Sequence, residues 1–505
     1  STLFPYTTLF RSDIADLHAV CRLMNWAGML GTRVLLSSAT LPPGLIQALF
    51  AAYLAGRKMW QASCGINGRP VNICCAWFDE KDADATQIYD GPGFRDAHAK
   101  FVARRAVMLA EKERLHFGRV ASISSASSAI QDVTERVAQT VHTQMLKLHQ
   151  AHRQRHESGK TVSLGLVRFA NINPLVAVTK ALIVIPSPED VCIHYCVYHS
   201  RHPLAVRSDI EKRLDRAFTR HNELDFWNNE DIADALHNRP ESHHLFVVLG
   251  TSVIEVGRDW DADWGIIEPS SMRSIIQFAG RIQRHRRNVP TSENLVILRS
   301  NIKSLQKKAP AFCKPGFETK EHLLNSHDIC ELIPIADYRT INALPRILSA
   351  NNANKLAELE HSRLSAELMS SKSKHVVAAQ WWRAPLSWNG WMQRQTPFRY
   401  SPLPEAVFFL HMDDEESEAR FYSRTGDNER KAQGNFRREE VRCASGVACW
   451  GEMDYQHVLL NLADKQSCEI ANVGEKFAEV RVPVSEEDAV DDWRYHPWLG
   501  VFRNM

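Results

Sequence analysis

The side chains best suited to chemistry lie in the segment QFAGRIQRHRR, at 277–287. On a helix, Gln277, Gly280, Arg281 and Arg284 fall at i, i+3, i+4 and i+7 and therefore share one face. Like charges at this spacing cost roughly a few tenths of a kcal/mol, which favours an anion opposite the arginines. Guanidinium groups bind phosphate through paired hydrogen bonds, so phosphate is the expected anion. The alternative is a solvated basic helix face.

A second candidate group follows an apolar predicted strand, LFVVL, at 245–249. The chain continues through Thr251 and Ser252 to Gly257 and Asp259. A turn of small, hydroxyl-bearing residues after a strand exposes backbone N–H groups, which hold phosphates in many proteins. This turn precedes the arginine segment by about 30 residues, and the order and spacing strengthen an otherwise weak signal.

Ser38, Ala39 and Thr40 form a third group, at the end of the predicted buried strand RVLLSS (33–38). By itself the triplet is more typical of an ordinary cap before the apolar helix that two prolines open. Its place in the chain adds information, because the SAT triplet, the GTS turn and Q-x-x-G-R-x-x-R occur in that order. This is the order of motifs III, V and VI of superfamily 2 helicases, which the chain resembles.

The elements that must position these groups alternate between strand and helix from 161 to 300. Such alternation is typical of a parallel sheet covered by helices on both faces, with ligands at the carboxyl ends of the strands. The last helix of this stretch is expected to run from Met272 to Arg287, followed by a strand at LVIL (295–298). Beyond Asn301 the pattern weakens. The sequence therefore predicts an α/β fold.

Length and composition exclude several classes of protein. The 505 residues and 44% hydrophobic content exclude a small stapled peptide and a mostly disordered chain. The net charge is only +2, but six Arg and three Lys against one Glu give the stretch 272–308 a charge of +8. A nucleic-acid interface is therefore expected to be local. No apolar run approaches the roughly 20 residues needed to cross a bilayer, so no membrane partner is expected.

Eleven cysteines are scattered without a repeated short spacing, which indicates a reducing, cytoplasmic location. Cys192 and Cys196 lie four residues apart, near His194 and His199. A metal site is conceivable there, but the alternation of residue types favours a buried strand, and we assign no metal ligand.

The first twelve residues, STLFPYTTLFRS, contain the tripeptide TLF twice. They match the translation of a sequencing adapter residue for residue, and they lack the basic start and continuous apolar stretch of a signal peptide. We expect 1–12 to be an artefact and the natural sequence to begin at or near Asp13.

A closer resemblance is to the CRISPR-associated helicase–nuclease of type I-F systems, and it covers essentially everything after Ser12. The segments that carry it are LLSSATLPP (35–43), SLGLVRFANINPL (163–175), YHSRHPLAVRSDIEKRLD (198–215), TSVIEVGRDWDAD (251–263), IIQFAGRIQRHR (275–286) and HPWLG (496–500).

The resemblance implies the domain organisation. Two RecA-like lobes are expected, with a mixed accessory domain after them. The corresponding residues are 13–125 for the remnant of the first lobe, 126–310 for a complete second lobe, 311–379 for a linker and 380–505 for the C-terminal accessory domain.

The resemblance also implies roles for the candidate residues. Arg281 and Arg284 are the expected catalytic arginine fingers, and such a finger raises the rate of phosphoryl transfer by about 10³ to 10⁵. Residues expected to bind ATP are Gly257, Asp259, Gln277 and Gly280, and those expected to couple hydrolysis to movement are Ser38, Ala39 and Thr40. Residues expected to bind DNA are Thr251, Ser252 and, as weaker candidates, Arg168 and Arg201.

The implied function is that of an ATP-dependent single-stranded-DNA translocase and nuclease in CRISPR interference. Its expected partners are the displaced strand of an R-loop and the RNA-guided surveillance complex. Its expected cofactors are ATP and Mg²⁺, with nuclease metal ions in an HD domain. The chain contains no G-x-x-x-x-G-K-S/T loop, no DExH box before the SAT triplet and no HD domain. We therefore expect this chain alone neither to hydrolyse ATP nor to cut DNA.

Two other functions stay open from the sequence. The first is a different superfamily 2 DNA translocase, and the second is a non-catalytic module that binds single-stranded DNA. Four tryptophans bear on the second, because aromatic residues interleaved with arginines stack on bases. They are Trp381, Trp382, Trp388 and Trp391. The alternative is that these tryptophans form the core of an accessory domain.

Overall fold

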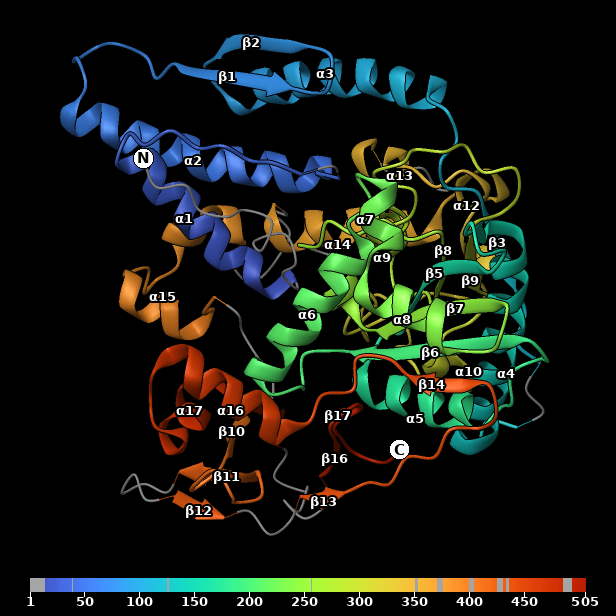
Figure 1. The fold of residues 1–505 in the computed structure, drawn as a ribbon. Helices are drawn as coiled ribbons and strands as arrows, with labels where there is room; N and C mark the ends of the chain where they lie inside the picture. The colour runs from blue at the N-terminus through green and yellow to red at the C-terminus, as the bar shows by residue number, and fades with distance from the viewer. Residues whose placement is uncertain are drawn as a thin grey trace.

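The structure is a computed structural model (Figure 1). It describes residues 14–38, 40–124, 127–255, 257–349, 353–369, 376–398, 404–424, 430–432, 436–484 and 493–505. The predicted adapter segment and Ala39 lie outside these described residues. None of the helices within the described ranges combines the length and the apolar character needed to cross a bilayer.

The N-terminal region is a group of helices beside a two-stranded antiparallel hairpin, at the top left of Figure 1. Its elements are η2 (Ile14–Asp16), α1 (Leu17–Met29), α2 (Pro43–Cys64), β1 (Ile73–Phe78), β2 (Ala83–Ile88) and α3 (Gly91–Glu111). Helices α1 and α2 pack closely at two glycines. A Cβ on Gly28 would lie 2.2 Å from the carbonyl oxygen of Tyr53, and one on Gly56 would lie 2.0 Å from that of Asn25.

The prediction of a buried strand at 33–38 is wrong. These residues carry no strand assignment, and Leu35 is 60% exposed. A strand is stabilised by hydrogen bonds to a neighbouring strand, and in the described residues the sheet of this region consists of β1 and β2 alone. The apolar run therefore remains unpaired, whereas the helix expected after it forms as α2, with Pro43 in its first turn.

A large parallel sheet forms the centre of the molecule, with strand order β14-β6-β7-β5-β8-β9-β3. Its neighbours along this path all pair in parallel, and the short β4 pairs antiparallel with β5. The strands are β3 (Gly118–Ala121), β4 (Gln154–Arg155), β5 (Thr161–Arg168), β6 (Val191–Tyr198), β7 (His243–Gly250), β8 (Trp264–Ile267), β9 (Leu295–Leu298) and β14 (Val447–Cys449). The predicted α/β fold is confirmed.

Helices cover both faces of this sheet. Alternate strand residues reach opposite faces, and Val133 and Leu175 of one helical layer and Ile210 and Ile275 of the other belong to separate buried clusters. The first layer consists of α4 (Ile130–His152) and α5 (Ile172–Ile183). The second includes α6 (Leu204–Phe218), α7 (Glu223–Trp227), α8 (Glu230–Asn238) and α9 (Met272–Ala279).

Strands from three stretches of the chain share this sheet, and that departs from the predicted boundaries. Strand β3 comes from the stretch assigned to the first lobe, yet it pairs with β9. Strand β14 comes from the C-terminal stretch, yet it pairs with β6, and Figure 1 shows it in orange beside that strand. The boundary predicted at 125 therefore cuts off an edge strand of the second lobe.

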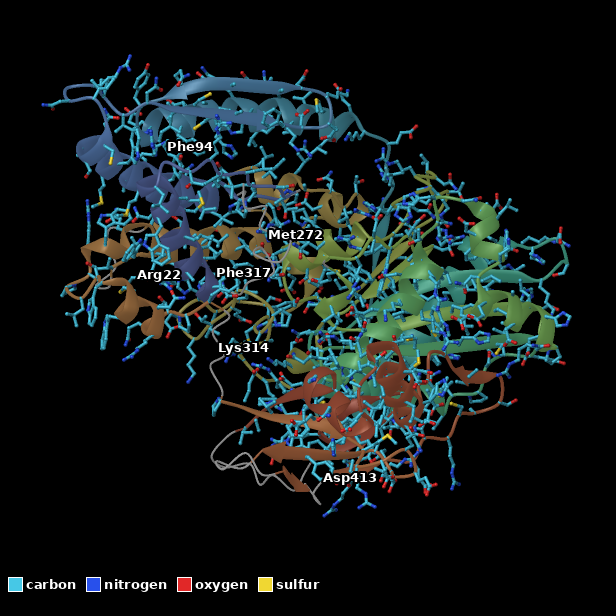
Figure 2. All side chains as sticks on the ribbon, turned by 60° about the vertical axis from the view of Figure 1, so that its left-hand side comes forward. Arg22, Phe94, Met272, Lys314, Phe317 and Asp413 are labelled. Atoms are coloured by element: carbon cyan, nitrogen blue, oxygen red, sulfur yellow. The ribbon has the colours of Figure 1, made fainter. Side chains whose placement is uncertain are left out.

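The stretch between the sheet and the C-terminal unit is largely helical. Its elements are α10 (Ile302–Leu305), α11 (Ile329–Leu332), α12 (Ile335–Arg339), α13 (Leu344–Ile347), α14 (Lys355–Leu368), η4 (Ala378–Arg383) and α15 (Asn389–Gln395). Its last part packs on α1. The rings of Trp26 and Trp381 meet edge to face at 6.3 Å. The guanidinium of Arg22, which Figure 2 labels, donates to Thr396 at 2.5 Å. The first tryptophans of the predicted accessory domain therefore pack on the N-terminal region.

The C-terminal unit begins at β10. It contains an antiparallel sheet of order β12-β11-β10-β15 and a smaller sheet of order β13-β16-β17, with two helices. Its elements are β10 (Glu405–His411), β11 (Arg420–Arg424), β12 (Arg430–Ala432), β13 (Arg437–Arg438), α16 (Tyr455–Gln466), α17 (Ile470–Phe477), β15 (Glu479–Pro483), β16 (Arg494–His496) and β17 (Gly500–Phe502).

Replacing Gly165 by alanine is expected to destabilise the protein by about 1–3 kcal/mol through overpacking. A Cβ at Gly165, in β5, would lie 2.2 Å from the ring of Trp264, which is fully buried. Urea unfolding measures the effect. Gly91→Ala is the control, because a Cβ there meets nothing within 4 Å. Equal stability of the two variants would contradict the packing described for this strand.

Candidate nucleotide and DNA site

The turn after β7 begins the candidate site. Thr251 is 6% exposed and precedes a short 3-10 helix, η3 (Ser252–Ile254), whereas Ser252 is exposed. Gly250 has no room for a side chain, since a Cβ would lie 2.6 Å from Ile254 and 2.9 Å from the carbonyl oxygen of Tyr198. Gly257 has a φ of +73°, which favours glycine. The conformation of the turn therefore depends on glycine at positions 250 and 257.

The helix that was expected to carry the arginines ends early. Helix α9 stops at Ala279 with Gly280 as its cap, so the expectation of a helix to Arg287 is wrong. The backbone of the next residues pairs elsewhere: the Ala262 N–H donates to the carbonyl oxygen of Arg281 at 2.8 Å, and the Gln283 N–H donates to that of Ala262 at 3.0 Å. These tertiary hydrogen bonds replace the helical ones, and Gln283 takes a φ of +51°.

Arg281 connects the arginine segment to the turn. Its Nε donates to the carbonyl oxygen of Glu255 at 2.9 Å, and its Nη1 donates to that of Arg258. A guanidinium between two backbone carbonyls fixes their positions. Arg281 therefore contacts the turn, and in this structure its guanidinium holds the turn's backbone.

Arg284 makes a different contact. Its Nε lies 2.5 Å from Oδ1 of Asp259, and the side chains are 42% and 60% exposed. Arg284, helped by His285 at 3.2 Å, lowers the pKa of Asp259 to about 2. An exposed pair of this kind is worth about 1 kcal/mol or less, so a stronger anion can displace the carboxylate. Arg284 is thus both held in place and open to solvent.

A buried network that the sequence analysis missed anchors the arginine segment. Arg286 Nε lies 2.7 Å from Asp261 and its Nη1 lies 2.6 Å from Asp263, which also pairs with Arg220 at 2.9 Å. Asp261 and Asp263 are 0% and 1% exposed. A signal was available in DWDADW (259–264), where three acids alternate with apolar residues directly before a predicted buried strand.

Arg168 is a structural residue in this fold. It is fully buried, its Nε lies 2.5 Å from Oε1 of Glu255, and it donates to the carbonyl oxygen of Glu268 and to Ser274 at 3.0 and 3.1 Å. Such a side chain does not reach a DNA phosphate. The structure therefore corrects the assignment of Arg168 as a DNA contact. Its ion pair with Glu255 instead anchors the turn to the buried side of the sheet.

Arg201 joins the second lobe to the C-terminal part of the chain. Its Nη1 donates to Oδ1 of Asn173 at 2.9 Å, and its guanidinium lies over the ring of Trp493, 5.1 Å from the centroid. Burial lowers its pKa to about 10. These contacts account for Arg201 as a residue that packs two parts of the chain together.

Ser38, Thr40 and Gln277 border one pocket between the N-terminal region and the second lobe. The Thr40 N–H donates to the hydroxyl of Ser38 at 3.2 Å. The pocket is lined by Ile14, Leu17, Ser38, Thr40, Pro42, Leu45, Arg273, Gln277, Phe317, Arg346 and Leu364. The structure therefore brings predicted residues from 38–40 beside one from the arginine segment, although 237 positions of sequence separate Thr40 from Gln277.

Two family models match the chain. Residues 161–287 match the C-terminal part of the CRISPR-associated nuclease/helicase Cas3, and residues 405–503 match the C-terminal domain of the Cas3 subtype I-F/YPEST-like group. The first covers four of the eight strands described in the central sheet, β5 to β8, together with the 251–259 turn and the arginine segment, and the second begins at β10. Fold and matches thus define the C-terminal region of a Cas3-type nuclease/helicase.

Two curated relatives identify the group. The chain is 47% identical over 502 residues to the CRISPR-associated nuclease/helicase Cas3 subtype I-F/YPEST of Pectobacterium atrosepticum, and 39% identical over 496 residues to that of Pseudomonas aeruginosa. The matches cover 97% of this chain and 45% and 46% of the two relatives. The chain belongs to the Cas3 family of subtype I-F/YPEST and spans less than half the length of these relatives.

Solved structures of Cas3 show a weaker similarity. The T. fusca Cas3-ATP structure matches 98% of this chain and 50% of its own at 13% identity, with a TM-score of 0.48. A CRISPR RNA-guided surveillance complex before nicking gives a TM-score of 0.41. The assignment to the family comes from the sequence relatives.

Replacing Arg168 by methionine is expected to cost about 3–5 kcal/mol of stability, because Glu255 is left as an unpaired buried charge. Denaturant unfolding measures the loss, and the double variant Arg168→Met/Glu255→Leu is expected to recover part of it. Arg104→Met is the control, since Arg104 pairs with Asp84 at the surface. A normally stable Arg168 variant that binds DNA less tightly would instead support a phosphate contact.

Proposed function

We propose that this chain is the part of an ATP-dependent single-stranded-DNA translocase and nuclease that contains the second helicase lobe and acts in CRISPR interference. One observation carries the proposal: Arg281 and Arg284 both contact the 251–259 turn, at the carboxyl end of β7. Ligands of parallel α/β sheets bind at this edge. The 47% identity to a subtype I-F/YPEST relative favours this family over a different superfamily 2 motor.

The contacts of the two arginines support different roles. Arg284 is held by one exposed carboxylate, so we propose that it exchanges Asp259 for the transferred phosphoryl group of ATP and stabilises the charge that develops there. Arg281 is engaged with the carbonyl oxygens of Glu255 and Arg258. It shapes the turn and thereby positions Gly257 and Asp259 on the nucleotide side of the cleft.

We assign ATP to the cleft between the N-terminal region and the second lobe. Gln277 of α9 lines this pocket together with Ser38 and Thr40, and Gly280 caps the same helix one turn further on. Hydrolysis of a nucleotide bound there would therefore act directly on Ser38 and Thr40, which suits residues that couple hydrolysis to movement along DNA. Mg²⁺ and the P-loop that cradles the phosphates are assigned to the first lobe of the full-length protein.

DNA is assigned to the other side of the turn. Ser252 is exposed beside the buried Thr251, so its hydroxyl and nearby backbone N–H groups are available to a phosphate. The proposed substrate is the displaced strand of an R-loop opened by an RNA-guided surveillance complex in the cytoplasm. The cutting step and its metal ions belong to an HD domain of the full-length protein.

Arg284→Ala is expected to lower the DNA-stimulated rate of ATP hydrolysis of the full-length protein by about 10³-fold or more, without changing its melting temperature. The missing guanidinium leaves the charge on the transferred phosphoryl group unstabilised. Phosphate release in the presence of single-stranded DNA measures the rate.

The matched control is Arg299→Ala. Arg299 is 46% exposed and pairs with Asp328 at 2.6 Å, much as Arg284 pairs with Asp259. We expect full activity from it. Unchanged hydrolysis by the Arg284 variant would contradict the assigned role, and DNA-stimulated hydrolysis by the 505-residue chain alone would contradict the assignment of the P-loop to another part of the protein.

A second candidate function, binding of single-stranded DNA by stacking, is supported by the exposure of two tryptophans. Trp388 is 67% and Trp391 37% exposed, whereas Trp381 is 7% exposed and belongs to the core. Large aromatic side chains open to solvent beside Arg394 can stack on bases. The four tryptophans therefore divide between the two interpretations, with Trp388 the one best placed for DNA.

Trp388→Ala is expected to weaken binding of single-stranded DNA by about 5- to 150-fold, the loss of one stacked base, at an unchanged melting temperature. Fluorescence anisotropy of a labelled oligonucleotide measures the affinity. Trp381→Ala serves for comparison and is expected to cost about 3–5 kcal/mol of stability. A fall in the melting temperature of the Trp388 variant with unchanged DNA affinity would assign Trp388 to the core as well.

A further inference from the structure

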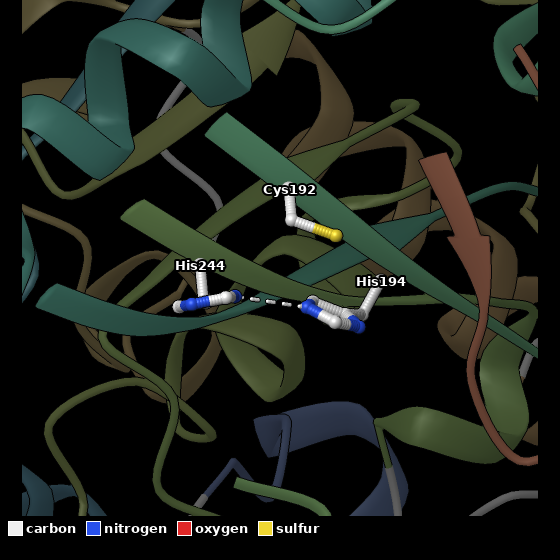
Figure 3. Close-up of side chains that lie close together, drawn as sticks. All are labelled: Cys192, His194 and His244. Atoms are coloured by element: carbon white, nitrogen blue, oxygen red, sulfur yellow. Dashed lines mark hydrogen bonds between the residues drawn. The ribbon is translucent and has the colours of Figure 1, made fainter. Parts of the chain in front are cut away.

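Three metal-ligating side chains meet inside the central sheet, away from the turn. Cys192 and His194 lie on β6, and His244 lies on β7, directly opposite Cys192 in the strand register. Because Cys192 and His194 are two residues apart, both project from the same face of the sheet, where Figure 3 shows them beside His244. Their exposed fractions are 0%, 7% and 0%, so the cluster is buried.

The spacing of the ligand atoms suits a tetrahedral metal ion. The Cys192 sulfur and one ring nitrogen of each histidine all lie within 4.8 Å of one another, and His194 Nε2 is 3.2 Å from His244 Nδ1. Zinc–nitrogen bonds of 2.0–2.1 Å in a tetrahedron place two nitrogens roughly 3.3 Å apart. The two imidazoles are thus already at the separation that shared coordination of zinc requires.

Without a metal, the polar atoms of this buried cluster have few hydrogen-bond partners. Burial lowers the pKa of His194 to about 3 and that of His244 to about 4, and raises the pKa of Cys192 to about 11, so all three are neutral. The two imidazoles share one hydrogen bond. Nearby, Oε2 of Glu241 is buried with no hydrogen-bond partner, and this carboxylate further raises the pKa of the Cys192 thiol. A buried carboxylate oxygen without a hydrogen-bond partner is costly unless a cation lies nearby.

We propose that Cys192 Sγ, His194 Nε2 and His244 Nδ1 bind a zinc ion that stabilises the amino-terminal end of strands β6 and β7. Binding breaks the S–H bond of Cys192 and releases its proton to solvent, while the proton between the imidazoles moves to an outer ring nitrogen. The thiolate and the Glu241 carboxylate together balance the two positive charges. Cysteine and histidine are the donor set that zinc prefers.

The position of the cluster makes this a structural site. Cys192 and His244 are each the second residue of their strands, and the 251–259 turn follows the last residue of β7. At about 3.3 Å per residue, the two sites are roughly 20 Å apart. A second group in the described residues, His221, Asp259 and His285, has its carboxylate paired with Arg284 and is largely exposed, so it is a weaker candidate.

Cobalt titration of the purified 505-residue chain after removal of metal by a chelator tests the proposal. We expect one Co²⁺ per chain, with the visible and near-ultraviolet absorption of a tetrahedral thiolate complex, and displacement of Co²⁺ by Zn²⁺. Cys192→Ser is expected to abolish the absorption. Cys196→Ser is the matched control, because Cys196 lies on the same strand face and is 1% exposed but outside the cluster, and it should bind as the parent does.

Three results would overturn the proposal: no Co²⁺ absorption from the parent chain, the same absorption from the Cys192 variant, or its loss from the Cys196 variant. If Cys192→Ser fails to fold, measurements on the parent chain alone test the proposal. We then expect thiolate absorption from the Co²⁺ complex and a melting temperature that falls when the chelator removes the metal. Neither measurement depends on ATP or DNA, so the outcome is separate from that of the proposed function.

Discussion

The carboxylate of Asp263 is the interaction on which the geometry of the site depends. It is 1% exposed and accepts hydrogen bonds from Arg220, Arg286, Gln154 and the backbone N–H of Leu164. Burial opposes its ionisation, but the two guanidinium groups outweigh burial and lower its pKa. One acid thereby joins the start of β8, the middle of β5, strand β4, the loop after α6 and the arginine segment. Removing either arginine would leave a buried negative charge uncompensated.

This network explains why the arginine segment is not a helix. Arg286 is drawn to Asp261 and Asp263, and the backbone around Arg281 pairs with Ala262. The helix must therefore end before these contacts, and Gly280 provides the stop. The result is a segment in which the two arginines contact different parts of the turn: Arg281 holds the carbonyl oxygens of Glu255 and Arg258, and Arg284 pairs with the solvent-exposed carboxylate of Asp259. A continuous helix would have placed both on one face.

The central sheet also joins parts of the chain that its sequence keeps far apart. Its edge strands, β3 and β14, come from before and after the continuous βα pattern, and each is held by parallel pairing to a strand distant in the sequence. Local periodicity indicates that a strand exists but says nothing about its partner. The predicted domain boundaries therefore missed both edge strands, and they placed Trp381 with the C-terminal unit although it packs against α1.

What the sequence by itself determined is whatever follows from local pattern: the parallel α/β core, the glycine-dependent turn after β7, and the order of the motifs, because strand alternation and turn chemistry are properties of short segments. The tertiary structure alone decided which charges are buried and which are open. Arg168 and Arg284 are both arginines in motif-like segments, yet one is sealed against Glu255 and the other is exposed beside Asp259. Burial is the sum of contacts from many distant residues, and no short segment encodes it.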